Sequence, residues 1–221
     1  MKKAFTMIEL VFIIVVIGIL AATIIPRVQT NPIQEAGVQL VSHIRYTQHL
    51  AMIDDKYDVS DANWFKKRWQ IVFGNTDAAA GGVPAYSIFS DTAVGSTGNI
   101  NTSEVARNPE NSTQYMTGGY SGAAALDITD AAFNGMRKLN LGMSYGVSTI
   151  TLSGGCANGR ISFDYEGRPL QGDQSTMTGA YSAPTQRLIV SDCNVTLSDT
   201  NGNNLVITVR PETGYASITQ Y

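Results

Sequence analysis

Charged residues are scarce in this chain. Asp, Glu, Lys and Arg together make up 15% of its 221 residues, and the formal net charge is −3. So low a charged fraction is unusual for a cytosolic enzyme, and the abundance of Gly, Ser, Thr and Asn favours an exported domain. A mildly acidic chain also lacks the general positive charge with which nucleic-acid binders hold phosphates.

Histidine and cysteine are nearly absent, with two of each. His43 and His49 are six positions apart on a predicted helix, whereas side chains that share a helix face are three or four positions apart. Neither histidine is near Cys156 or Cys193 in sequence, so a zinc site lacks ligands. The chain also contains no nucleophile elbow and no phosphate-binding loop. We therefore expect no enzyme activity, no catalytic residue, no metal and no cofactor.

The two cysteines lie beside predicted strands. In an oxidising compartment, a disulfide between Cys156 and Cys193 would contribute roughly 3–4 kcal/mol on the chain-entropy model. Two buried free thiols are the alternative, and we favour the disulfide.

One hydrophobic run is long. Lys2 and Lys3 precede it, and its 21 residues from Phe5 to Ile25 include a single charged side chain, that of Glu9. At about 1.5 Å per residue, such a helix reaches roughly 30 Å, so the run predicts a transmembrane helix with a cytoplasmic amino end. A secretory signal is the alternative, but the apolar run continues past the weak cleavage signal at residues 21–23.

The carboxylate of Glu9 is costly in such a helix. An acidic residue in a membrane-spanning helix costs on the order of 2.5–3.5 kcal/mol, less near a helix end, so it indicates a functional site. A side chain that merely reaches the lipid headgroups is the alternative interpretation.

The residues around Glu9 resemble a known family. Ala4–Leu10 reads AFTMIEL and is followed by VFIIVVIGILAATIIPR, which is similar to the N-terminus of type IV prepilins and of the pseudopilins of type II secretion. The resemblance implies that a prepilin peptidase cleaves between Ala4 and Phe5 and that Phe5 is then N-methylated. Ala4 departs from the usual Gly of the family, and because Ala is the next smallest residue we expect cleavage to survive.

The resemblance also implies a role for Glu9 in assembly. In a filament of staggered helices its carboxylate lies against the new amine of Phe5 in a neighbouring subunit, and each charge offsets the desolvation of the other. The implied partners are other pilin or pseudopilin subunits, the prepilin peptidase, an inner-membrane assembly platform and, before assembly, the lipid bilayer. The implied location is the bacterial inner membrane, crossed once with a cytoplasmic N-terminus and a periplasmic head, and then the pilus or pseudopilus.

Gly18 and Pro26 are predicted helix breakers. Gly lowers helix stability, and Pro removes a backbone donor. The family has breakers at such places, which let the helix bend during extraction into a fibre. A Pro26 that simply marks the lipid–water boundary is equally consistent with the sequence.

A second helix is predicted after Asn31, with Pro32 at its first position and Gln34 closing a capping box. Its apolar residues recur at helical spacing and define one face that must pack on another element: Ile33, Gly37, Leu40, Val41, Ile44 and Ala51. Whether the break at residues 30–32 makes one bent helix or two stays open.

The remainder of the chain is predicted to be mainly β. Turn signals at Asn201-Gly202 and Pro211–Gly214 predict that the last three strands form an antiparallel meander. The predicted fold class is therefore α+β, a pilin-like lollipop in which a long N-terminal helix, half membrane-spanning and half amphipathic, packs on a mainly antiparallel β head. Most of the strand candidates are rich in β-branched or aromatic residues: Trp69–Phe73, Ala85–Phe89, Val147–Leu152, Arg160–Tyr165, Arg187–Ser191, Val195–Ser198, Leu205–Arg210 and Tyr215–Gln220.

The predicted organisation has four parts, which are a leader at 1–4, a transmembrane and assembly helix at 5–26, an amphipathic helix at 27–56 and a β-rich periplasmic head at 57–221. A long loop at about 90–146 interrupts the head and holds one short predicted helix around Ala123–Met136. Loops of this length are usually functional or mobile.

Two head segments, Gly159–Pro169 and Val209–Ile218, resemble the minor pseudopilins of the H type and related minor pilins, and the length of the head also suits a minor subunit. We therefore expect a structural minor pilin or pseudopilin of a type IV pilus or type II secretion filament. Which machine uses it, including one for DNA uptake, stays open. An unprocessed, membrane-tethered binding module is the alternative from another class.

A role in DNA binding would depend on Asn63–Phe73. Lys66, Lys67 and Arg68 are flanked there by aromatic residues, which can stack on single-stranded bases. In the alternative interpretation, which we favour, the strand that follows alternates into the core and the basic side chains face water.

Two acidic segments are candidate calcium sites. Asp54, Asp55, Asp58 and Asp61 cluster after the second helix, where we favour a solvated acidic loop over a site. Residues 199–204 begin like a calcium loop but have Asn rather than Gly at the sixth position, so we expect a hairpin turn.

Overall fold

The computed structural model describes residues 6–24, 31–93, 95–156, 158–181 and 187–220, and of 21–24 it describes the backbone alone. The chain divides into two compact units, Met1–Asn31 and Pro32–Tyr221. We describe each unit by itself.

Among its described residues the first unit has the helix α1 (Met7–Ile24), and the second unit begins with α2 (Pro32–Ile53). The prediction of one long N-terminal helix with a membrane-spanning half is wrong. Pro32 lacks a backbone N–H and disfavours the helical conformation for Asn31, so α2 starts afresh there. Among the residues that the structure describes, no helix is both long and apolar enough to span a membrane.

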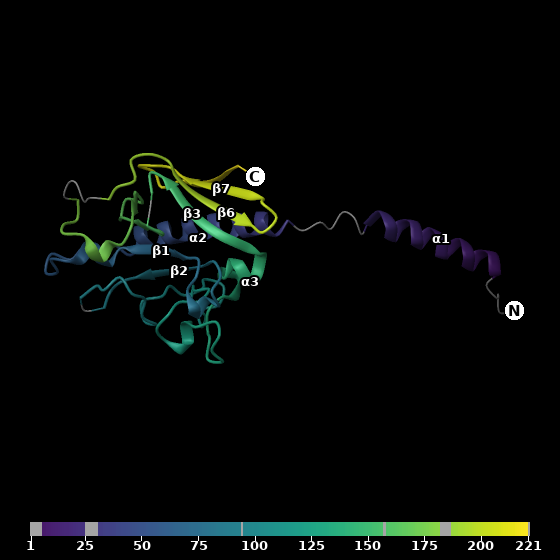
Figure 1. Ribbon diagram of the computed structural model, residues 1–221, viewed down its shortest axis with the longest axis horizontal. Helices are drawn as coiled ribbons and strands as arrows, with labels where there is room; N and C mark the ends of the chain where they lie inside the picture. Colours follow the sequence, from purple (N-terminus) through teal and green to yellow (C-terminus); the bar gives the residue numbers. More distant parts are fainter. Residues whose placement is uncertain (1–5, 25–30, 94, 157, 182–186, 221) are drawn as a thin grey trace. The chain divides into compact units, whose positions relative to one another are not determined.

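The second unit contains two antiparallel four-stranded sheets, so the α+β class is confirmed (Figure 1). The first sheet has the order β2-β1-β4-β5, with β1 (Trp69–Gly74), β2 (Ala85–Ser90), β4 (Arg160–Phe163) and β5 (Pro169–Gln171). The second has the order β3-β6-β7-β8, with β3 (Val147–Gly154), β6 (Cys193–Asp199), β7 (Asn204–Val209) and β8 (Ala216–Gln220). The predicted meander of the last three strands is confirmed.

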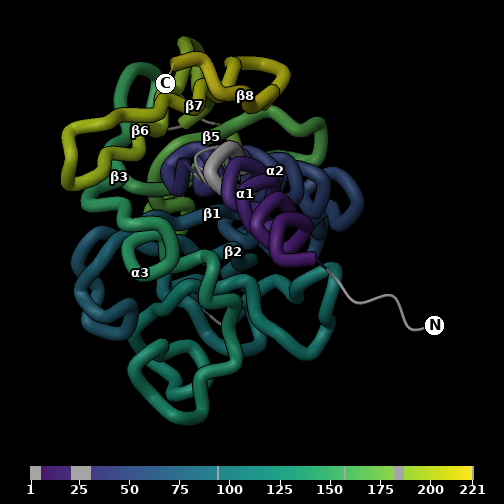
Figure 2. The backbone as a smooth tube through the Cα atoms, turned by 90° about the vertical axis from the view of Figure 1, so that its right-hand side faces the viewer, coloured from purple at the N-terminus to yellow at the C-terminus, as the bar shows by residue number. Residues whose placement is uncertain are grey.

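Helix α2 lies between the two sheets (Figure 2) and contacts strands of both. A Cβ at Gly37 would lie 2.6 Å from Cδ2 of Leu205 on β7, so glycine allows the close approach of helix and sheet. The predicted apolar face is confirmed, because the buried residues of α2 are Ile33, Ala36, Gly37, Leu40, Val41, Ile44, Thr47 and Ala51.

Seven of the eight predicted strands are present, and the one at Arg187–Ser191 is wrong. Arg187 has a φ of 54°, which is not extended, and only Leu188 forms a bridge, to Leu170. Strand β5 was not predicted, because it has three residues and begins with Pro169.

The helix predicted around Ala123–Met136 is also wrong. This stretch instead holds the 3-10 turn η4 (Ala124–Leu126), followed by η5 (Arg137–Leu139) and the short helix α3 (Leu141–Tyr145). Asp127 and Asp130 accept hydrogen bonds from backbone N–H groups two residues further on, at 2.8 Å each, which compete with helical hydrogen bonds. The long loop nevertheless packs against β2, with Met116 and Leu126 fully buried.

Candidate functional site

The first turn of α1 is closed by Thr6 and Glu9. Oε2 of Glu9 accepts hydrogen bonds from Thr6 N–H at 2.9 Å and from Thr6 Oγ1 at 2.7 Å. In return, Glu9 N–H donates to Thr6 Oγ1 at 3.4 Å. This is a capping box, in which Thr6 is the N-cap and Glu9 the third helical residue. This capping box was not predicted, although the Thr-x-x-Glu spacing is its signal in the sequence.

The surface of α1 is apolar on every side. From Met7 to Leu20, the large apolar side chains are all exposed, between 38% at Val16 and 87% at Met7. Glu9 and its neighbours Ile8, Phe12 and Ile13 line a groove of about 410 Å³. The helix therefore presents one carboxylate, at its start, on an otherwise hydrophobic cylinder.

Of the other predicted assembly and processing residues, Ala4, Phe5 and Pro26 lie outside the described residues. Gly18 lies within α1, which continues through it, and a Cβ there would meet no atom within 4 Å.

The predicted disulfide between Cys156 and Cys193 is present. Cys193 is the first residue of β6 and pairs in register with Gly154 at the end of β3. The bond thus joins two neighbouring strands at one end of their sheet, and both sulfur-bearing residues are buried. The alternative of two free thiols is excluded.

Two of the three basic side chains in Lys66–Arg68 are paired or buried. Lys67 Nζ lies 2.6 Å from Oδ2 of Asp61. Arg68 is 3% exposed, and its guanidinium lies between the rings of Trp64 and Tyr181, 5.2 and 4.8 Å from their centres. Arg68 is therefore packed into the head rather than presented to a ligand, and the expectation that this side chain faces water is wrong.

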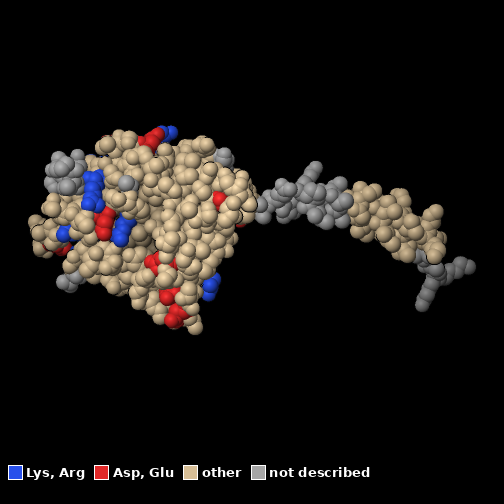
Figure 3. Space-filling view, viewed as in Figure 1, with Lys and Arg blue, Asp and Glu red and all other residues tan. Residues whose placement is uncertain are grey.

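The charged groups on the face shown in Figure 3 are few, and basic and acidic side chains lie close together there. Most of the visible surface of the head carries neither sign. No extended basic patch for a phosphate backbone is seen on this face.

The acidic segment after α2 is held by protein groups. Asp54 pairs with Lys56 and accepts from Trp69 Nε1 at 2.8 Å, and Asp58 accepts from Ser60 N–H at 2.8 Å. In the described part of the chain, no group of three or more His, Cys, Asp or Glu side chains is arranged to hold a metal. Residues 199–204 form the β6–β7 hairpin turn, as predicted.

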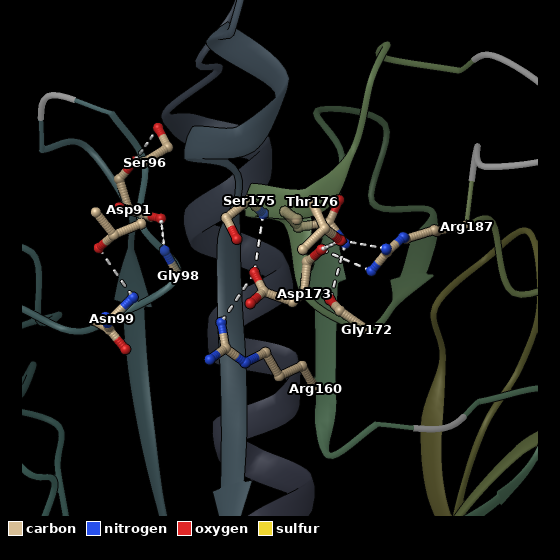
Figure 4. A network of polar contacts seen from close by, with 12 residues as sticks. Asp91, Ser96, Gly98, Asn99, Arg160, Gly172, Asp173, Ser175, Thr176 and Arg187 are labelled. Atoms are coloured by element: carbon tan, nitrogen blue, oxygen red, sulfur yellow. Dashed lines mark hydrogen bonds and ion pairs between the residues drawn. The ribbon is translucent and has the colours of Figure 1, made fainter.

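Figure 4 shows a polar network that joins β4 to segments distant in sequence. Nη1 of Arg160 lies 3.3 Å from Oδ1 of Asp173, which also accepts from Ser175 N–H at 2.9 Å. Arg187 donates to the backbone C=O of Asp173 at 2.7 Å. A Cβ at Gly98 would lie 2.5 Å from Oδ2 of Asp173, and the φ of 79° at this position favours glycine.

Asp91 is a buried carboxylate beside this network. Its Oδ2 accepts from Gly98 N–H at 2.7 Å, while its Oδ1 has no hydrogen-bond partner among the described residues. Burial raises the pKa of Asp91, the N–H of Gly98 opposes this shift, and the charges of Glu104 and Asp173 add to it. The hydrogen bond between Gly98 and Asp91 joins two residues seven positions apart in the segment that follows β2. Sequence reasoning missed the network, because its members are not neighbours in sequence.

Comparison of the chain with protein-family models, with curated proteins and with solved structures gives no match. The functional assignment therefore depends on the residues of the chain itself.

Proposed function

We propose that the protein is a minor structural subunit of a filament of the type IV pilus or type II secretion kind, with no enzymatic activity of its own. The single observation that carries the proposal is the exposed hydrophobic surface of α1, which is interrupted by one carboxylate at its start. The resemblance of Ala4–Leu10 to prepilins supports it from the sequence side.

An apolar helix surface of this kind is unfavourable in water. Each Å² of apolar area removed from water stabilises the buried state by about 25 cal/mol, and contiguous exposed apolar surfaces mark interaction sites. Packing α1 against the α1 helices of neighbouring subunits would remove that area from water. In this proposal α1 is the assembly element, and the head remains outside the helical core of the filament.

Glu9 gives the packed helices their register. Leader removal between Ala4 and Phe5 creates a cationic amine, and the Glu9 carboxylate of a neighbouring subunit pairs with it. Oε2 of Glu9 already accepts two hydrogen bonds from Thr6, so Oε1 is the oxygen best placed to receive the amine. In a low-dielectric surrounding either charge alone is strongly unfavourable, so pairing favours one stagger of the helices.

The head is adapted to an oxidising compartment, because its disulfide would not persist in a reducing cytosol. We place it on the periplasmic side, with the prepilin peptidase, the assembly platform and other filament subunits as partners. The burial of Arg68 and the pairing of Lys67 give no support to DNA capture as a second function.

Mass spectrometry of the mature N-terminus tests the proposal. We expect a chain that begins with N-methylated Phe5 when the protein is produced together with a prepilin peptidase. A chain that keeps Met1–Ala4 in an active, fully assembled filament would contradict the proposal.

A matched pair of variants separates the two roles of Glu9. Thr6→Ala removes the cap partner and keeps the carboxylate, whereas Glu9→Gln keeps the shape and removes the charge. We expect Glu9→Gln to abolish incorporation into filaments and Thr6→Ala to reduce it slightly, as measured by the amount of subunit in sheared filaments. Equal defects in both variants would mean that Glu9 acts as a helix cap alone.

A further inference from the structure

Three of the four outer sheet edges are covered by other parts of the chain. Strand β2 forms isolated bridges to Val105 and Thr117, and β5 forms one to Leu188. On β3, the side-chain amide of Asn75 bonds both backbone groups of Ile150, at 2.9 and 2.8 Å. The fourth edge, β8, lies at the outside of its sheet (Figure 2), and the side chain of Arg45 covers one of its backbone groups, the C=O of Ala216.

The backbone groups of β8 point alternately toward β7 and away from it. Arg210 N–H donates to the C=O of Tyr215 at 2.9 Å, and Ala216 is the register partner of Val209. Because this direction alternates along an antiparallel strand, the N–H and C=O groups of Ala216 and Ile218 face away from β7. Arg45 already occupies the C=O of Ala216, so the N–H of Ala216 and both backbone groups of Ile218 are the ones available to another strand.

A groove of about 430 Å³ lies between this edge and α2, and it is lined by Val38, Val41, Ser42, Arg45, Ser217 and Ile218. Val38 is 58% exposed although it is apolar. Arg45 donates to the C=O of Ala216 at 2.8 Å and lies 5.1 Å from the ring centre of Tyr215. Among the described residues, no carboxylate pairs with Arg45, so the groove holds an uncompensated positive charge.

We propose that β8 and α2 form a docking site for an extended segment of a partner protein. The segment adds to the sheet as a fifth strand, places apolar side chains on Val38 and Ile218, and places a carboxylate on Arg45. Main-chain hydrogen bonds supply the affinity in such strand addition, and the side-chain contacts supply the selectivity. The site belongs to the head alone, so it stands whether or not the protein enters a filament.

A fluorescent peptide that alternates valine and threonine and carries one glutamate is the probe, with the full-length protein in detergent as the binding partner. We expect saturable binding by fluorescence anisotropy. N-methylation of the peptide on the N–H groups that face β8 removes hydrogen-bond donors and should weaken binding about tenfold or more.

Two substitutions in the protein locate the binding. Ile218→Pro removes one outward N–H of an edge strand without touching the inward ladder, and it should weaken binding to a similar extent. Arg45→Gln should abolish the preference for the glutamate peptide over its lysine counterpart. Arg107→Gln is the matched control, because Arg107 also lies over a tyrosine ring, that of Tyr115, but does not line the groove.

Three outcomes would overturn the proposal. Absence of saturable binding excludes the site, and equal binding of the N-methylated peptide shows adsorption of an apolar chain rather than strand addition. Self-association of the protein that the peptide displaces and that Ile218→Pro abolishes would assign the edge to a second copy of this chain instead.

Discussion

Helices α1 and α2 are of similar length and have opposite surroundings. α1 has 18 residues and exposes large apolar side chains on every side, whereas α2 has 22 residues and buries one face, which includes Leu40 and Ile44. An amphipathic helix needs a partner on one side, and α2 finds it in the two sheets of its own chain. A helix that is apolar all round needs apolar surroundings on all sides. The stability of the head should therefore depend on α2 and not on α1.

Leucine truncation should show the largest difference between the two helices in their effect on the stability of the head. Leu40 has no exposed surface, so Leu40→Ala removes buried apolar area and leaves a cavity. We expect the free energy of unfolding of the head to fall by about 2–5 kcal/mol. Chemical denaturation followed by the fluorescence of Trp64 and Trp69, which belong to the head, measures this change.

Leu10→Ala is the matched control, because Leu10 is 54% exposed on α1. The same measurement should change by no more than about 0.5 kcal/mol. An equal loss of unfolding free energy in both variants would contradict this distinction, because α1 would then contribute to the folding of the head.

Removal of the disulfide should have the next largest effect. Its two cysteines are 37 positions apart, so the bond restricts the unfolded chain, and replacing both with alanine should cost about 2–4 kcal/mol. Thermal unfolding followed by circular dichroism checks this. A reducing agent should lower the melting temperature of the natural protein and leave that of the double variant unchanged. Equal melting temperatures of the two proteins without reductant would show that the bond does not stabilise the head.

The sequence predicts those parts of the fold that a local pattern of apolar or turn-forming residues indicates. The spacing of Leu40 and Ile44 follows the helical period, and the strands of the final meander follow turn signals such as Asn201-Gly202. The strand predicted at Arg187–Ser191 is reduced to a single bridge at Leu188, and Arg187 at its start has a left-handed backbone. The helix predicted around Ala123–Met136 fails because aspartate side chains bond the local backbone.

The same distinction separates the sites that the sequence predicts from those that it does not. Glu9 is noticeable in the sequence because it is the only charge in an apolar run, and the disulfide follows from there being two cysteines. The network around Asp173 joins residues that are far apart in the chain, and the docking edge exists because β8 lies last in its sheet. No local pattern encodes these two features, because they depend on the order of the strands.

The smallest predicted effect is the pH dependence of stability that comes from His43, a polar residue of α2. Nδ1 of His43 lies 2.6 Å from Oη of Tyr86, and Nε2 of Gln39 donates to the same Oη at 2.9 Å. The tautomer of His43 decides which of the two groups donates, and a neutral imidazole can form this hydrogen bond in either role. Burial lowers the pKa of His43 to about 4, whereas its ordinary value is 6.5.

The unfolded chain therefore binds a proton at His43 at a pH where the folded chain does not. This contribution to stability is fully present above about pH 6.5 and is lost as the pH falls toward about 4. Between about pH 7 and pH 5 we expect a loss of about 2 kcal/mol in the free energy of unfolding, measured by urea denaturation. His43→Gln should flatten this dependence, and His49→Gln, an exposed position on the same helix, should leave it intact. An unchanged pH dependence in His43→Gln would show that the protonation of His43 is not coupled to folding.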